Sequence, residues 1–210
     1  MGLRFRATLA LDRLRRWFGV PLRCAPRGSA GRVSPDDSLS FSVGGQDALL
    51  CYGRPFARGR HIFGGLIPYD ALWRTGANEP TLLYLPFRAH VAGMRVPKGV
   101  YSLYTVPSRD RWTLVLNRAT RQWGLTRDEL GADGKWYPNA YREWIEAAEV
   151  GRAEIETRVV PHVEQLTARA EIQDGGTTTL LIEWETVQIR IPIRVASQVL
   201  TDWAEGSAAG

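Results

Sequence analysis

The sequence has little cysteine and histidine, and it contains no long apolar run. Its two cysteines, Cys24 and Cys51, are too few for a disulfide-rich scaffold, and we expect free thiols because isolated cysteines are usually simply buried. The histidines His61, His90 and His162 lie far apart without metal-ligand spacing, so no bound metal is expected. No apolar stretch approaches the length of a transmembrane helix.

Positive charge is concentrated at the N-terminus. Residues 1–33 hold eight arginines against one acid, Asp12, for a net charge of +7; the chain total is +5, so residues 34–210 carry −2. A mildly acidic body does not form the basic groove that nucleic acid requires, so no nucleic-acid partner is expected. Charged residues after Leu11 interrupt the apolar core of any secretory signal, which favours a cytoplasmic or peripheral membrane location.

The N-terminal arm, residues 1–33, is predicted to contain an amphipathic helix followed by a linker. Residues 7–18 place apolar side chains at helical spacing, with arginines largely around the other face. The apolar positions are Ala7, Leu11, Leu14 and Phe18. Such a helix binds an anionic membrane, docks on a protein partner or packs on its own domain, and these alternatives stay open.

Beyond Ser34 the hydrophobic pattern takes the two-residue period of β-strands. Asp174, Gly175 and Gly176 form a strong hairpin-turn signal, and Pro192 marks its strand as an edge or bulged one. Only residues 138–150 and 195–204 show a helical pattern in this part of the chain. The expected strands cover residues 39–43, 47–52, 81–87, 91–96, 100–106, 112–117, 153–160, 164–172, 178–184 and 187–193.

Residues 52–79, here called the glycine-rich segment, are the most informative part of the chain. They combine five glycines, two prolines and four arginines, and irregular backbone of this length needs specific contacts to be ordered. Arginine presents five donors in a rigid fork and stacks on aromatic rings, so the set suits a carboxylate, phosphate or sugar ligand. The candidate ligand-binding or loop-anchoring residues are Tyr52, Arg54, Arg60, Tyr69, Trp73, Arg74, Asn78 and Glu79.

Three ordered motifs carry a resemblance to a known family. They read YGRPFARGRHIFGGLIPYDALWRTGANE at residues 52–79, PKGVYSLYTVP at residues 97–107 and WTLVLNRATRQWG at residues 112–124. Over residues 34–193 the chain resembles the bacterial domain-of-unknown-function family 2911. The resemblance implies a single compact β-sandwich, relatives that are often exported, and no catalytic residue that is known for the family. It also implies an insertion between Gly124 and Val159.

We therefore predict an all-β fold, an antiparallel β-sandwich with an inserted helix, an N-terminal amphipathic helix and a short C-terminal helix. Residues 1–33 form the arm and linker, residues 34–195 the sandwich domain, and residues 196–210 a short helix and tail. Within the insertion, residues 136–144 offer a second surface for a protein partner or an anionic membrane. Their aromatic side chains are Trp136, Tyr137, Tyr141 and Trp144.

Two roles stay open for the glycine-rich segment. In the first, Arg60 or Arg74 pins it through an ion pair with Glu79 or Asp70. In the second, the arginines hold a ligand and one of these carboxylates acts as a base. No nucleophile–base pair or phosphate loop has a local signature, and no cofactor is expected. The sequence favours a binding or assembly module, such as an accessory subunit, over a hydrolase or lyase acting on a small anionic or carbohydrate substrate.

Overall fold

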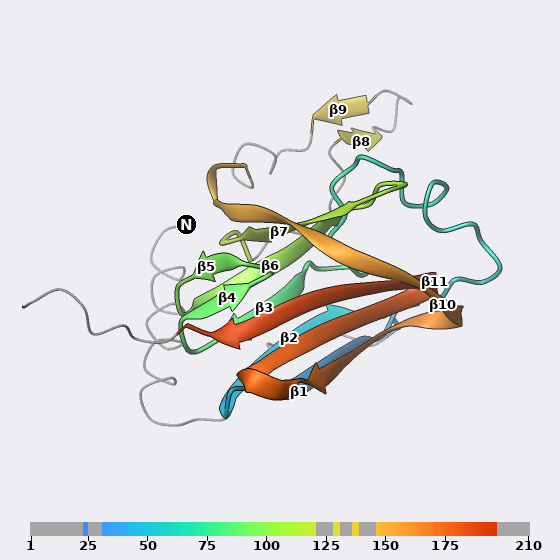
Figure 1. Cartoon of the computed structure of the whole chain (residues 1–210). Helices are drawn as coiled ribbons and strands as arrows, with labels where there is room; N and C mark the ends of the chain where they lie inside the picture. The colour runs from blue at the N-terminus through green and yellow to red at the C-terminus, as the bar shows by residue number, and fades with distance from the viewer. Residues whose placement is uncertain (1–22, 25–30, 121–127, 131–135, 139–145, 197–210) are drawn as a thin grey trace, which may run out of the picture.

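The computed structural model describes residues 23–24, 31–120, 128–130, 136–138 and 146–196. In these ranges the regular secondary structure is almost entirely β-strand, which confirms the all-β prediction. One antiparallel sheet of nine strands has the order β1-β2-β3-β6-β7-β10-β11-β4-β5, and β8 pairs with β9 apart from it (Figure 1). No helix in the described ranges is long and apolar enough to cross a bilayer.

The bounds of the strands follow the chain in order. The first five are β1 (Asp36–Val43), β2 (Gln46–Gly53), β3 (Thr81–Leu85), β4 (Ala89–Val91) and β5 (Met94–Val96). Next come β6 (Gly99–Val106), β7 (Trp112–Asn117), β8 (Asp128–Leu130) and β9 (Trp136–Pro138). The last two are β10 (Glu149–Ile172) and β11 (Thr177–Val195), joined by the 3₁₀ turn η1 (Asp174–Gly176).

The last two strands are much longer than the sequence predicts. The alternating pattern breaks near Pro161 and Glu185, and each break predicts the end of a strand. In the structure the breaks are irregularities within continuous strands: the β10–β11 register shifts twice between Val159 and Thr167, and Glu185 takes a φ of 55°. A bulge bends a strand without ending it, so β10 and β11 form one long bent hairpin (Figure 1).

The core lies on the inner face of this bent sheet, and part of the glycine-rich segment belongs to it. Phe63 and Trp73 of the segment pack against Trp112 of β7 and Trp184 of β11. The ring centroids of Phe63 and Trp112 are 4.8 Å apart, and Trp73 stacks on Trp184 at 5.8 Å. Burial of four large aromatic side chains stabilises the packing of the segment on the sheet.

The finer predictions about the fold are not confirmed. The sandwich is not confirmed, because within the described residues the β10–β11 hairpin continues the pairing from β7 round to β4 in one sheet. Of the helix predicted at residues 138–150, residue 138 belongs to β9, residues 139–145 lie outside the described ranges, residues 146–147 take a helical conformation and residues 149–150 belong to β10. Residues 7–18 lie outside them too, and of residues 195–204 only the first two are described, Val195 as the end of β11.

Cys24 and Cys51 form a disulfide, so the prediction of free thiols is wrong. Their Cα atoms are 5.7 Å apart. Cys51 lies in β2 on the outer face of the sheet, in a small apolar cluster with Leu49 and Leu82. The linker before β1 is therefore covalently attached to the sheet. Two cysteines separated by 27 positions have no diagnostic spacing, so the sequence does not reveal their proximity.

Candidate functional site

The glycine-rich segment leaves the end of β2 and first pairs with β10. Phe56 forms an antiparallel bridge with Gln165. The Ala57 amide donates to the Glu164 carbonyl at 2.7 Å, and the Leu166 amide donates to the Pro55 carbonyl at 3.0 Å. These bonds satisfy backbone groups that would otherwise lack partners, and they hold the first part of the segment in place.

Tyr52 and Arg54 connect this part of the segment to β1 and β10. The Nε of Arg54 donates to the Leu166 carbonyl at 2.9 Å and its Nη1 lies 3.2 Å from Asp37 Oδ2. The Tyr52 hydroxyl donates to the same Asp37 oxygen at 3.2 Å and accepts the Ala168 amide at 3.2 Å. Burial raises the pKa of the Tyr52 phenol, which keeps it a neutral hydrogen-bond donor.

Arg60 closes the turn that follows. Its Nε donates to the Ala57 carbonyl at 2.9 Å and its Nη2 to the Phe56 carbonyl at 2.6 Å. The backbone amide of Arg58 donates to Glu164 Oε1 at 2.8 Å, and this bond lowers the pKa of the Glu164 carboxyl. Arg60 thus supplies charged donors to two backbone carbonyls that belong to no strand.

Tyr69 packs closely against Gly64. A Cβ at Gly64 would lie 2.5 Å from the Tyr69 ring, and the glycine has a φ of 86°. On the same tyrosine, the guanidinium carbon of Arg109 lies 5.3 Å from the ring centroid, in a cation–π contact. The aromatic ring therefore holds the turn through van der Waals and cation–π contacts.

The second part of the segment pairs with β6. Trp73 and Thr105 exchange two backbone hydrogen bonds of 2.8 Å, and the hydroxyls of Thr75 and Thr105 are 3.1 Å apart. Thr75 has a φ of 53°, which is unusual for a β-branched residue and costs about 1–3 kcal/mol. Further on, Asn78 Nδ2 donates to the Ser34 carbonyl at 3.0 Å.

Glu79 is bound by the linker. Arg32 reaches it with two nitrogens, at 2.6 and 2.8 Å, and also lies 3.5 Å from Asp36. The hydrogen bond to Glu79 raises the pKa of the Arg32 guanidinium. The ion pair predicted between Arg60 or Arg74 and a carboxylate of the segment is therefore wrong: the arginine at Glu79 is Arg32. The sequence offers no signal for this partner beyond its charge, because it lies 47 positions away.

Arg74 differs from the other candidate residues. Trp73 points into the core, so its neighbours Leu72 and Arg74 face the outer side of the sheet, where Leu72 packs near Tyr104. The Nε of Arg74 is buried without a hydrogen-bond partner. Burial lowers the pKa of this guanidinium, against the attraction of Tyr104 and Glu79. The structure shows no ion pair for Arg74 within the described residues.

The carboxylates of the segment do not resemble a catalytic pair. Glu79 directs both oxygens to Arg32, and Asp70 is exposed on the surface. In the ranges that the structure describes, no three His, Cys, Asp or Glu side chains lie close enough to hold a metal ion. The arrangement instead combines several interactions within the fold with a half-buried cation, Arg74, whose Nε is buried and has no hydrogen-bond partner.

Comparisons with known proteins agree with the sequence motifs. The model of a family described as "Protein of unknown function (DUF2911)" matches residues 34–193. This range includes the whole glycine-rich segment and every strand of the large sheet, apart from the last two residues of β11. No curated protein and no solved structure matched the chain. The family match covers most of the sequence, and the chain belongs to the DUF2911 family.

Proposed function

We propose that the protein is a binding module that holds a small anionic ligand at Arg74. The observation that carries the proposal is the buried Nε of this side chain, which has no hydrogen-bond partner. The other seven candidate residues are hydrogen-bonded or packed within the fold itself. Arg74 is therefore the candidate whose donor groups are best placed to serve a ligand.

The energetics of a guanidinium that has a buried, unsatisfied donor support this proposal. A charge removed from water without a hydrogen-bonded partner costs several kcal/mol. A carboxylate or phosphate offers two oxygens to the planar guanidinium fork, and such charge-assisted bonds are about twice as strong as neutral ones. The hydrogen bonds of an anion bound at Arg74 would therefore offset the free energy lost when the Nε of Arg74 is buried. The outer face of β6, beside Tyr104, supplies the surroundings of the ligand.

The binding function fits the segment better than hydrolysis or lyase chemistry does. A general base needs an open position and a raised pKa, whereas Glu79 is engaged by the fork of Arg32. We further propose, as the sequence suggests, that residues 7–18 and 136–144 attach the module to a protein partner or an anionic membrane as an accessory subunit.

The proposal is tested by ligand-induced stabilisation. Thermal unfolding of the wild-type chain is followed with inorganic phosphate, sulfate and citrate, which present the same oxygen pairs. At concentrations well above Kd, the best of these should stabilise the protein by about 1–3 kcal/mol. Arg74→Met should abolish the effect, and Arg74→Lys should weaken it because lysine lacks the planar fork.

Arg118 provides a matched control, because it is an exposed arginine just beyond β7. Arg118→Gln removes one positive charge and should leave the stabilisation by the anion unchanged. Without ligand, Arg74→Met should unfold at the same urea concentration as wild type or a higher one, since a buried unpaired charge has been removed. A large loss of stability in Arg74→Met, with the anion effect retained, would show a structural role instead.

A further inference from the structure

One end of the large sheet carries a row of basic side chains, here called the basic strip: Arg88, His90, Arg95 and Arg194. The strand register places His90 of β4 directly opposite Arg194 of β11 on one side and opposite Arg95 of β5 on the other. Arg88 precedes β4 by one residue and, two positions from His90, shares its face. The three arginines are exposed.

The inner face of the same strands is entirely apolar. Ala89, Val91 and Ile193 are fully buried and Val96 is 2% exposed. Because side chains alternate along a strand, burial of these residues fixes the strip on the outside. Packing of the core therefore fixes these basic side chains in a row, although their positive charges repel one another.

Like charges that lie opposite one another on adjacent strands destabilise a sheet. Elsewhere on β10 and β11 the arginines are neutralised by nearby glutamates: Arg152 by Glu149, Arg158 by Glu156, and Arg169 by Glu171 and Glu183. Within the described residues the three arginines of the strip form no ion pair. His90 likewise has a buried Nδ1 without a hydrogen-bond partner.

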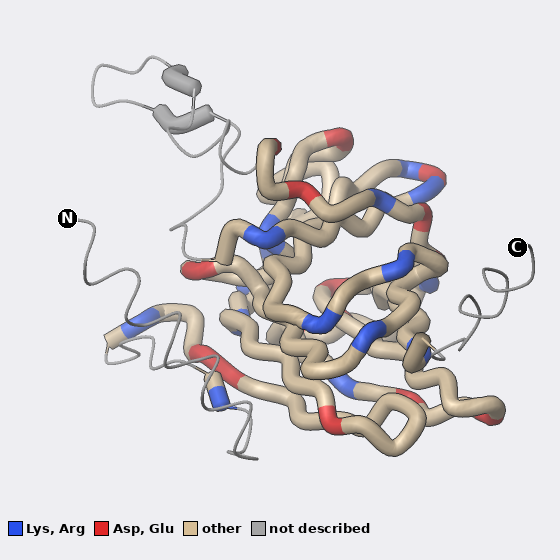
Figure 2. Tube along the Cα trace, turned by 90° about the vertical axis from the view of Figure 1, so that its left-hand side faces the viewer, with Lys and Arg blue, Asp and Glu red and all other residues tan. Residues whose placement is uncertain are grey.

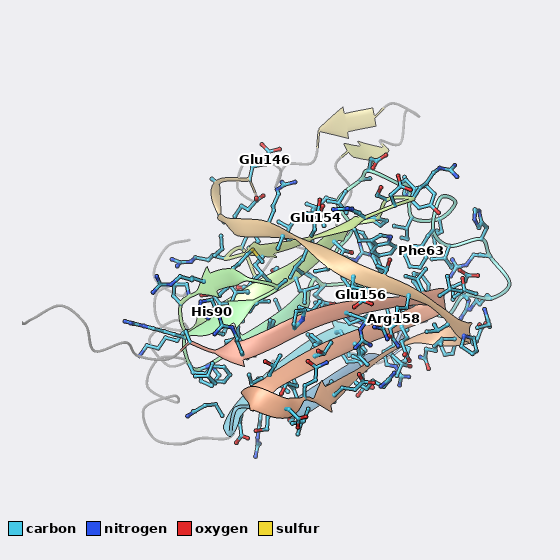
Figure 3. The ribbon with its side chains drawn as sticks, viewed as in Figure 1. Phe63, His90, Glu146, Glu154, Glu156 and Arg158 are labelled. Atoms are coloured by element: carbon cyan, nitrogen blue, oxygen red, sulfur yellow. A yellow bond between two sulfur atoms is a disulfide. The ribbon has the colours of Figure 1, made fainter. Side chains whose placement is uncertain are left out.

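The strip is separate from the Arg74 site. Figure 3 places His90 near the β4 end of the sheet and Phe63 at the other end, and Phe63 packs on Trp73 next to Arg74. In Figure 2, which faces the side of the molecule where β4 and β5 lie, Lys and Arg segments gather in the middle of the view. Asp and Glu segments lie mainly around its periphery. This face of the body thus carries clustered positive charge although the net charge of the body is only −2.

We propose that the basic strip docks on the anionic surface of a phospholipid bilayer. A protein interface usually has buried aromatic or aliphatic anchors at its centre. The large exposed apolar residues found in the described ranges, Val33, Leu66, Val159 and Ile172, all lie outside the strip. An anionic bilayer needs no such anchor, because it attracts arginine through surface potential alone. The N-terminal arm, at +7, adds a second attraction of the same kind.

The test measures co-sedimentation of the full chain with phosphatidylcholine vesicles, with and without phosphatidylglycerol. The strip variant is Arg88→Gln/Arg95→Gln/Arg194→Gln. The control variant, Arg111→Gln/Arg158→Gln/Arg169→Gln, loses the same net charge from exposed arginines elsewhere on the surface. Thermal unfolding midpoints verify that both variants are folded, and polyglutamate serves as a soluble acidic competitor.

Wild type should bind the phosphatidylglycerol vesicles and not the neutral ones. The strip variant should bind at least about tenfold more weakly, and the control variant within about twofold of wild type. Equal losses in the two variants would reduce the effect to net charge and overturn the proposal. Vesicle binding of the strip variant that equals that of wild type would overturn it too. So would a wild-type chain that does not bind anionic vesicles but binds polyglutamate through the strip.

Discussion

Gly53 allows the two ends of the glycine-rich segment to meet. A Cβ at this position would lie 2.2 Å from the carbonyl oxygen of Ala77, whose amide donates to the Gly53 carbonyl at 3.3 Å. Gly76, on the opposite side, would bring a Cβ within 3.0 Å of that same carbonyl. The segment therefore closes on itself through a backbone-to-backbone approach that only glycine permits.

We expect Gly53→Ala to lower the free energy of unfolding by about 2–3 kcal/mol, because the obstructing atom is backbone and cannot rotate away. Gly151→Ala is the matched control. Its Cβ would approach only the Met94 sulfur, at 3.2 Å, and that flexible side chain can move. Urea unfolding of both variants measures the difference; similar losses in the two would contradict the close approach at Ala77.

A second prediction at this scale concerns His90. Burial, together with Arg194 and Arg95, lowers the pKa of the imidazole in the folded protein. The unfolded chain, with an ordinary histidine pKa of about 6.5, then binds the proton more readily. The contribution of His90 to stability is present at higher pH and is lost as the pH falls through that ordinary pKa toward the folded value.

The measurement is the urea midpoint at pH 7.5 and pH 5.5, for wild type and His90→Gln. Wild type should lose stability on acidification, and the variant should lose less. Arg88 lies on the same face as His90 and is a further basic neighbour of the imidazole. An identical pH dependence in the two proteins would show that other groups account for it.

At the scale of single residues, sequence reasoning could find the candidate positions but not their partners. The density of arginine and aromatic side chains pointed to Arg54, Arg60 and Glu79, and each makes specific contacts in the structure. Their partners are backbone carbonyls and a linker arginine, Arg32, which become neighbours only when the chain has folded. Nothing in the local pattern distinguishes Arg74, whose unsatisfied Nε depends on burial.

At the scale of structural elements, the Cys24–Cys51 disulfide is the main feature that the sequence did not predict. It attaches the linker to β2, and Arg32 then lies within reach of Glu79. The same linker supplies the Ser34 carbonyl to Asn78. The bond therefore helps to hold the last residues of the glycine-rich segment from outside the sheet.

Reduction of the Cys24–Cys51 bond should lower the free energy of unfolding by about 3–4 kcal/mol, given a closed loop of 27 positions. Urea unfolding with and without dithiothreitol measures this loss. Cys24→Ser should show the same loss without reductant and no further change on its addition. A thiol assay that finds two reactive cysteines in the unfolded, unreduced protein would contradict the bond.

The strands themselves were largely predictable, while their lengths were not. Two-residue alternation located β1 and β7, and turn signals located β2 and β6. Most residues of β2, β6 and β7 are buried on both faces of the sheet. Alternation predicted the end of a strand where a strand in fact continues through an irregularity, as at Glu185. A bulge shifts the alternation just as a loop does, so the two look alike in the sequence. Alternation also merged β4 and β5 into one strand, since Ala92 and Gly93 give a weak turn signal.

For the whole molecule, composition was a poor guide to both shape and charge. Alternation reveals which face of a strand is buried but not how a sheet bends, so a sandwich and a single bent sheet look alike in sequence. Net charge likewise hides the cluster of exposed arginines at the β4–β5 end of the sheet. The disulfide bears on location, because such bonds persist in oxidising compartments and are rare in the cytoplasm.

The order of contacts along the chain has a consequence for biosynthesis. During synthesis from the N-terminus, both cysteines of the Cys24–Cys51 bond are made early. The Leu166 carbonyl that accepts from Arg54 lies 112 positions after this arginine and is made much later. Contacts of such long range form slowly, and domains exposed before they close are vulnerable to proteases and aggregation. Until β10 has been synthesised, the first part of the glycine-rich segment has no sheet to pair with. A nascent chain halted before residue 164 would therefore present this segment, with its arginines and aromatic rings, as a recognition signal for chaperones and proteases.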